Sequence, residues 1–352
     1  MSRYPDITLD EAREALSFVS PELPREDWIS VAYALQSEFG GVAWELFDAW
    51  SQGGSTYDPA DARSAWRSLK SDRGVGIAPL LKRAKEGGWR QRQRTPEQAE
   101  QTKKEAEARR ARMRAEEQAK QARERRVQEA VAALSHELIS NHLQTTGRSP
   151  YLENKQVRAH GLYFARRSVL VVMDKASAGW QIHTSRADVD AFFTAHRQYQ
   201  GADPEQVPYS FRYIKPGTLA VPFRDIDRKL WSVQLIFPSG TKSFFRGSRK
   251  QATFHLLGTA PRASKRRKTV WMAEGYATAA TVHELTQCPT VMAIDAGNLL
   301  PVAKAVRKLW PAVDIAFAAD NDADKPGNPG VTAATAAAQA VGGYVVVPKI
   351  GE

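Results

Sequence analysis

Acidic side chains with a potential for metal chemistry stand in the last quarter of this 352-residue sequence. Glu274 follows the apolar run at 269–273, and Asp320 and Asp322 follow the apolar run at 313–318. Carboxylate oxygens suit Mg²⁺, which needs only one or two of them when substrate phosphates complete its shell. A metal held there could neutralise charge on phosphoryl oxygens during nucleotidyl transfer. A lone acidic cluster after a strand is more often a solvated loop, so a metal site requires that the fold bring these residues together.

The elements that would position these carboxylates alternate between strand and helix. Strand-like apolar runs separate helical patterns; the runs lie at 269–273, 290–294, 313–318 and 344–347, and the helical patterns at 277–285, 300–309 and 331–340. Such alternation predicts a parallel sheet covered by helices, with ligands bound at the carboxyl ends of the strands. Glu274, Asp295 and Asp320 each follow one of these strands. We therefore expect three carboxylates at one edge of one sheet.

The same segment resembles the Toprim family. The Glu-Gly pair at 274–275, the Asp-Ala-Gly-Asn stretch at 295–298 and the Asp-Asn-Asp triplet at 320–322 are similar to the Toprim branch of plasmid and phage primases. The resemblance implies that Glu274, Asp320 and Asp322 are catalytic and bind Mg²⁺ or Mn²⁺. Asp295, Asn298 and Asp324 are second-tier site candidates. A helix-capping role for Asp295 or Asn298 is as compatible with the sequence as catalysis.

Residues 150–258 resemble the segment that precedes Toprim in those primases. Strand-like runs at 168–173, 219–223 and 231–237, with a turn at 238–240, predict a mixed α+β region. By resemblance this region faces the metal and binds template and nucleotides. The candidates for nucleotide or nucleic-acid binding are Arg224, Lys242, Arg246 and Lys250. Each is equally compatible with a surface charge on a hairpin. A basic run at 262–268 could contact nucleic-acid backbone or serve as a solvated linker.

Residues 1–89 read as four or five short helices around several tryptophans, and they resemble the helical domain called primase C-terminal domain 2. Residues 90–134 contain almost only Ala, Glu, Gln, Lys and Arg, which favours a long helix that is polar all round. The first interpretation of that helix is a solvated spacer. The alternative is an arm that follows phosphates through basic residues, namely Arg109, Arg110, Arg112, Arg114, Arg123, Arg125 and Arg126.

Composition restricts the class of protein. The chain has 50 basic and 39 acidic residues, a net charge of +11, which favours a polyanionic partner. The single cysteine, Cys288, excludes a disulfide framework and a cysteine-based zinc site, so the zinc ribbon of bacterial replicative primases is not expected. Neither a signal peptide nor a membrane span is expected, and the expected location is the cytoplasm. Template selection is then expected to lie in the N-terminal helices.

The expected architecture is a multidomain α+β and α/β chain. It comprises a helical domain (1–89), a charged helical linker (90–134), a basic primase-core subdomain (135–264) and a catalytic Toprim domain with a parallel sheet (265–352). The expected function is that of a DNA primase of a plasmid, phage or mobile element, an RNA polymerase that makes short primers on single-stranded DNA. Its expected partners are the template, ribonucleoside triphosphates and a replicative helicase or a missing C-terminal helicase part. The alternatives are a Toprim nuclease and a non-catalytic DNA-binding replication-initiation protein.

Overall fold

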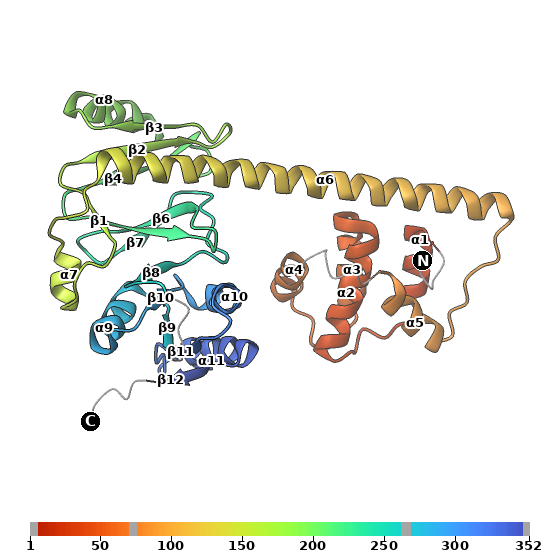
Figure 1. Ribbon diagram of the computed structural model, residues 1–352. Coiled ribbons are helices and arrows are strands. Elements are labelled where there is room, and N and C mark those ends of the chain that lie inside the picture. The colour runs from red at the N-terminus through yellow and green to blue at the C-terminus, as the bar shows by residue number, and fades with distance from the viewer. Residues whose placement is uncertain (1–5, 70–75, 262–268, 348–352) are drawn as a thin grey trace. The chain divides into compact units, whose positions relative to one another are not determined.

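The computed structural model of the protein describes residues 6–69, 76–261 and 269–347 (Figure 1). The basic run at 262–268 lies outside these ranges. The contacts between residues divide the chain into two compact units, Met1–Ala122 and Arg123–Glu352. Each unit is described by itself below.

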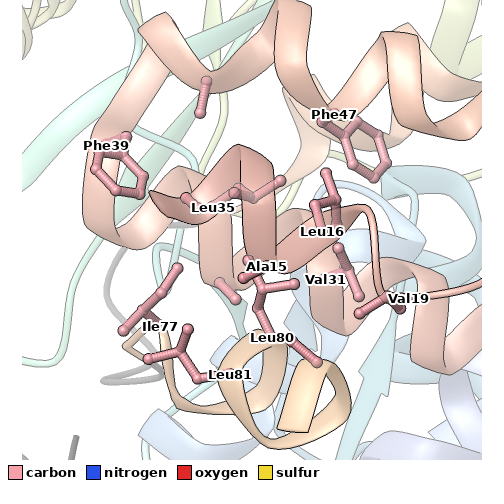
Figure 2. Packing of buried hydrophobic residues seen from close by; sticks show 14 of the residues in the cluster. Ala15, Leu16, Val19, Val31, Leu35, Phe39, Phe47, Ile77, Leu80 and Leu81 are labelled. Carbon is pink, nitrogen blue, oxygen red and sulfur yellow. The ribbon is translucent and has the colours of Figure 1, made fainter. Parts of the chain in front are cut away.

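The first unit is helical. Its short helices are α1 (Leu9–Leu16), α2 (Arg25–Phe39), the 3-10 turn η1 (Gly40–Ala43), α3 (Trp44–Ser51), α4 (Pro59–Ser68) and α5 (Ala78–Glu86). Thr8 and Glu11 form a capping box at the start of α1, and Asp58 caps α4. Figure 2 shows Leu16, Leu35 and further apolar side chains packed together from α1, α2, α3 and α5. The predicted small helical core is therefore present.

The long helix α6 (Pro96–Glu137) begins in this unit. Thr102 and Ala106 are buried, and Arg109 Nε donates a hydrogen bond to Glu38 O over 2.9 Å. The Arg109 and Arg110 guanidinium groups both pair with the buried Glu38 carboxylate. The expectation of a solvated spacer is thus wrong for this part of the helix, because small side chains and paired arginines pack here, together with a single large apolar side chain of the helix, Met113, next to Gly40. Arg109 and Arg110 are also not available to follow phosphates.

The helix α6 is exposed from residue 118 to residue 126 and then enters the core of the second unit. Val131 and Leu134 are fully buried there, against strands of two small sheets. A short π-helical segment, η2 (Leu138–His142), ends it. The same helix therefore contributes buried side chains to two different cores, with a solvated stretch between them.

The first part of the second unit contains two antiparallel sheets. One sheet has the strand order β3-β2-β4. Its strands are β2 (Val169–Asp174), β3 (Trp180–His183) and β4 (Tyr209–Ile214). The helix α8 (Arg186–His196) and the 3-10 turn η3 (Arg197–Tyr199) connect β3 to β4 along the chain. The other has the order β1-β5-β6-β7, formed by β1 (Tyr163–Phe164), β5 (Leu219–Arg224), β6 (Leu230–Ile236) and β7 (Lys242–Ser243), with α7 (Pro150–Lys155) before it. The predicted hairpins are present, although β7 is only two residues long.

The second part is a five-stranded sheet with the order β12-β11-β9-β10-β8. Its strands are β8 (His255–Leu257), β9 (Thr269–Ala273), β10 (Thr290–Met292), β11 (Asp314–Ala318) and β12 (Tyr344–Val346). Four strands are parallel, as predicted, and β8 adds an antiparallel edge. The helices α10 (Ala296–Leu309) and α11 (Pro329–Val341) pack on one face, and α9 (Tyr276–Thr286) packs on the other.

One hydrophobic cluster joins this sheet to the β1-β5-β6-β7 sheet. Val221 and Phe223 from β5 pack with Tyr276 from α9 and Met292 from β10, and all four are fully buried. Because interiors are close-packed, this cluster fixes the loops of the antiparallel sheet relative to the carboxyl edge of the parallel sheet. No helix in the described ranges has the length and apolar character needed to cross a membrane.

Candidate metal and nucleotide site

The parallel sheet brings the predicted carboxylates to adjacent strands. Glu274 follows β9 directly and Asp320 stands two residues after β11, while β11 pairs with β9. Asp322 lies in the loop between β11 and α11. Strand alternation and strand order therefore place two of the three side chains next to one another, and a short loop adds the third.

The carboxyl group of Glu274 is in an unfavourable electrostatic position. Burial, and then the negative charges of Asp320, Asp322 and Asp295, raise its pKa to about 7. Its Oε1 atom is buried and has no hydrogen-bond partner. Among the described residues, no lysine or arginine forms an ion pair with Glu274 or Asp320. A buried acceptor without a partner, surrounded by like charges, is what a cation-binding site requires of its ligands.

The two aspartates are held by neighbouring side chains. Thr278 Oγ1 donates to Asp320 Oδ1 over 3.2 Å, and Lys325 Nζ donates to Asp322 Oδ1 over 2.8 Å. Asn328 Oδ1 accepts a hydrogen bond from Asp322 N at 3.1 Å while Asn328 caps α11 from the left-handed region, with φ of 40°. Sequence reasoning missed Thr278 and Lys325; only their closeness to the two acidic motifs along the chain could have indicated them.

The chemistry of these side chains, rather than their spacing in this structure, fits a metal ion. In the part of the chain that the structure describes, no three His, Cys, Asp or Glu side chains stand close enough together to hold a metal ion as they are. The donor set fits a hard cation in its chemistry, since all three groups offer carboxylate oxygens and one of those oxygens is without a partner.

The second-tier residues have structural roles or none. Asp295 caps α10, since its side chain accepts a hydrogen bond from Asn298 N at 3.1 Å. Asn298 is buried; its amide donates to Thr253 O and Ala293 O and accepts from Ala252 N. The structure thus assigns capping and core hydrogen bonding to these two residues. Asp324 is exposed on the loop after β11.

A cavity of about 440 Å³ lies beside the carboxylates. Asp320, Gly275 and Thr278 line one side of it, and Lys242 and Lys155 line another. Neither lysine forms an ion pair with a described carboxylate. Gly275 precedes α9 and makes no side-chain cap at the N-terminus of that helix. The cavity therefore combines one carboxylate, two lysines and a helix N-terminus, which suits a metal-bound phosphate. The sequence indicated Lys242 but not Lys155.

The other predicted basic residues lie elsewhere. Arg224 Nη1 donates to Arg228 O over 3.0 Å, and Arg224 lines a separate cavity of about 600 Å³ beside β8. Arg246 forms a two-pronged, exposed ion pair with Glu205, at 2.9 and 3.2 Å. Lys250 is closer to the carboxylate edge, with Nζ 3.8 Å from Asp295 and 4.7 Å from the centre of the Phe244 ring. Of the four, Lys242 is the one that lines the cavity with Asp320.

Comparison with known proteins finds likenesses to primases. Residues 12–84 match the family model described as "Primase C terminal 2 (PriCT-2)". The chain is 41% identical over 132 residues to a DNA primase TraC of Escherichia coli, covering 36% of this chain and 12% of that protein. A second Escherichia coli DNA primase TraC is 40% identical over 132 residues, covering 36% of this chain and 9% of that protein. The chain thus spans about a tenth of the length of these relatives.

A solved DNA primase domain from Pseudomonas aeruginosa is 16% identical and has a TM-score of 0.37, covering 64% of this chain and 71% of that domain. The two sequence likenesses, to the family model and to the TraC primases, are the ones that bear on function.

Proposed function

We propose that this chain is the catalytic part of a DNA primase of plasmid or phage type, which makes short RNA primers on single-stranded DNA. The observation that carries the proposal is the carboxylate edge of the parallel sheet, where Glu274 has a buried oxygen without a partner and Asp320 lines a cavity together with Lys155 and Lys242. The likeness to the TraC primases supports the choice of reaction. The proposed place of action is the cytoplasm, where the chain would act on DNA.

Glu274, Asp320 and Asp322 would hold a divalent cation, Mg²⁺ or Mn²⁺. When bound, such a cation neutralises charge on phosphoryl oxygens and lowers the pKa of an attacking hydroxyl group. Thr278 orients Asp320 through the hydrogen bond between Thr278 Oγ1 and Asp320 Oδ1. The proposed role of these side chains is therefore to keep charged groups in fixed positions. Electrostatic stabilisation of this kind is the main requirement of nucleotidyl transfer.

Lys242 and Lys155 would bind the triphosphate of a ribonucleotide in the 440 Å³ cavity. Ammonium groups form charge-assisted hydrogen bonds with phosphate oxygens, and the N-terminus of α9, where Gly275 makes no side-chain cap, favours an anion. The basic strands of residues 135–264 would carry the single-stranded template, because these residues include 18 basic and 9 acidic side chains. A replicative helicase, either separate or as a further part of a longer chain, would be the remaining partner.

The test uses the full chain, single-stranded DNA and radiolabelled ribonucleoside triphosphates. The wild type and Asp190→Ala, a change at an exposed site on α8, are expected to form new short oligonucleotides. The double variant Asp320→Ala with Asp322→Ala is expected to form none. Survival of priming in the double variant would overturn the proposed site. Shortening of the DNA without new oligonucleotides would favour the nuclease, and DNA binding with neither reaction would favour the initiation protein.

A further inference from the structure

The loop between β11 and α11 brings a lysine onto one of the proposed metal ligands. Lys325 Nζ lies 2.8 Å from Asp322 Oδ1. Two turn hydrogen bonds shape the loop around this pair: Lys325 N donates to Asp322 O over 2.9 Å, and Asn328 N donates to Lys325 O over 3.1 Å. The backbone of the loop therefore presents Lys325 to Asp322.

Lys325 is distinguished from the other cations near the site. Among the described residues, it is the one lysine or arginine that forms an ion pair with any of Glu274, Asp320 and Asp322. The hydrogen bond to Asp322, followed by the negative charges of Asp322, Asp324 and Glu274, raises the pKa of Lys325. The ammonium group is thus close enough to respond to two of the three proposed ligands.

The two partners differ in exposure. The side chain of Lys325 is 60% exposed, while that of Asp322 is 29% exposed. An exposed lysine on a flexible four-carbon stem can leave a carboxylate for water at little cost. Asp322 belongs to a half-buried group of like charges. A positive partner therefore stabilises the charge of Asp322 more than a negative partner stabilises the charge of the exposed Lys325.

We propose that Lys325 is an internal counter-charge for Asp322, which a divalent cation must displace, and that this exchange sets the affinity of the site for the cation. The inference rests on the proposed metal site and deepens it. Lys325 competes for the Asp322 oxygen that the cation needs, and its positive charge also repels the cation. Both effects act in the same direction, so removal of the ammonium group tightens cation binding.

The test is a titration of the full chain with Mn²⁺ alone, with free Mn²⁺ measured by electron paramagnetic resonance. The double variant Asp320→Asn with Asp322→Asn supplies the background from other carboxylates. Lys325→Met removes the charge and keeps the length of the side chain, and Lys325→Arg keeps the charge. Lys304→Met, at an exposed lysine of α10, is the matched control. Thermal unfolding and circular dichroism of each variant verify that it is folded.

Lys325→Met is expected to lower the Kd for Mn²⁺ about two- to fivefold, the range that an exposed ion pair allows. Lys325→Arg and Lys304→Met are expected to bind as the wild type does. If Lys325→Met binds Mn²⁺ equally or more weakly, the counter-charge role is overturned while the metal site stands. If the wild type binds no more Mn²⁺ than the double aspartate variant, the proposed metal site itself is overturned, and this inference with it.

Discussion

The backbone of Gly330 packs directly against the backbone of Asp320. A β-carbon at position 330 would stand 2.4 Å from Asp320 O and 3.3 Å from Glu274 Oε1. The N-terminus of α11 can therefore approach the two proposed ligands only because residue 330 has no side chain. This contact couples the position of a helix to the position of the carboxylates.

Gly330→Ala is expected to displace the end of β11 or the start of α11, because Asp320 O is backbone and cannot rotate away. Overpacking of this kind costs about 1–3 kcal/mol, so thermal unfolding should shift to a lower temperature. Primer synthesis should fall at least about tenfold, since small misplacements of reacting groups are costly. Gly297→Ala is the control, because its β-carbon would meet Asp295 Oδ1 at an ordinary 3.5 Å. Equal behaviour of the two variants would contradict the argument.

Glu274→Gln is expected to separate stability from activity. Glutamine places no charge in this buried group of carboxylates, and its amide can donate hydrogen bonds to the neighbouring ones. In the presence of EDTA, the free energy of unfolding should therefore rise by about 1 kcal/mol. Primer synthesis should fall by about 100-fold or more, because a proposed ligand is lost. Calorimetry and a priming assay measure the two effects.

Glu284→Gln provides the contrast to Glu274→Gln. Glu284 accepts hydrogen bonds from Arg158 N and from His160, each at 2.8 Å, so its carboxylate has partners and its replacement should lower stability. If both variants lose stability, the carboxyl group of Glu274 does not destabilise the folded chain, which contradicts the prediction for Glu274→Gln.

Lys242→Met is expected to raise the KM for ribonucleoside triphosphates about tenfold and to change kcat little. The physical reason is the loss of a charge-assisted contact to phosphate, for which tenfold corresponds to about 1.4 kcal/mol. Steady-state primer synthesis at varied nucleotide concentration measures it, with Lys304→Met as the control. An unchanged KM would remove the cavity beside Asp320 from the proposed nucleotide site.

His255 should make the stability of the second unit depend on pH. Both ring nitrogens face carbonyl oxygens, with Nδ1 3.2 Å from Pro222 O and Nε2 2.7 Å from His160 O, and a neutral ring can donate to only one of them. Burial lowers the pKa of His255 to about 4 and outweighs the two carbonyl groups, which raise it. The ring is therefore neutral in the folded chain at pH values where an unfolded histidine takes up a proton.

The stabilisation is full above about pH 6.5 and is lost as the pH falls towards 4, and it amounts to roughly 3 kcal/mol. His255→Gln, which does not titrate, should cost less stability at pH 4 than at pH 7. Urea unfolding of both proteins at the two pH values measures the difference. The same cost at both pH values would contradict the prediction.

Contacts with single-stranded DNA should map to the second unit. Residues 1–89 contain 10 basic and 14 acidic side chains, in contrast to the basic excess of residues 135–264. Attraction to phosphates follows net positive charge, so the N-terminal helices are not expected to bind the template backbone. Photo-crosslinking of the full chain to iodouracil-containing DNA, followed by peptide mapping, should place adducts within residues 135–347. Adducts concentrated in residues 6–89 would contradict this prediction and support the N-terminal helices as the place of template selection.

Much of the fold could be predicted because it depends on local pattern. The alternation of apolar runs and helical patterns after residue 269 indicated the parallel sheet, and the carboxyl-end rule placed Glu274 and Asp320 at one edge of it. The antiparallel strand β8 was not predicted, since a three-residue strand has too short a pattern to recognise. The packing of α6 on the first unit was also not predicted, because the signal is small buried residues and paired charges, which look the same as a solvated face.

The sequence by itself determined the types of residue at the strand ends, the cysteine count and the charge of each region, because these are local or additive properties. Only the tertiary structure decided which charges meet. It placed Lys242 in the cavity beside Asp320 and placed Arg224 and Arg246 elsewhere. It also brought Lys155 to that cavity and paired Lys325 with Asp322. Such pairings depend on how distant segments pack and on the exact path of a loop, and neither is encoded in the period of a helix or a strand. The carboxylates were visible in the sequence, and their partners were not.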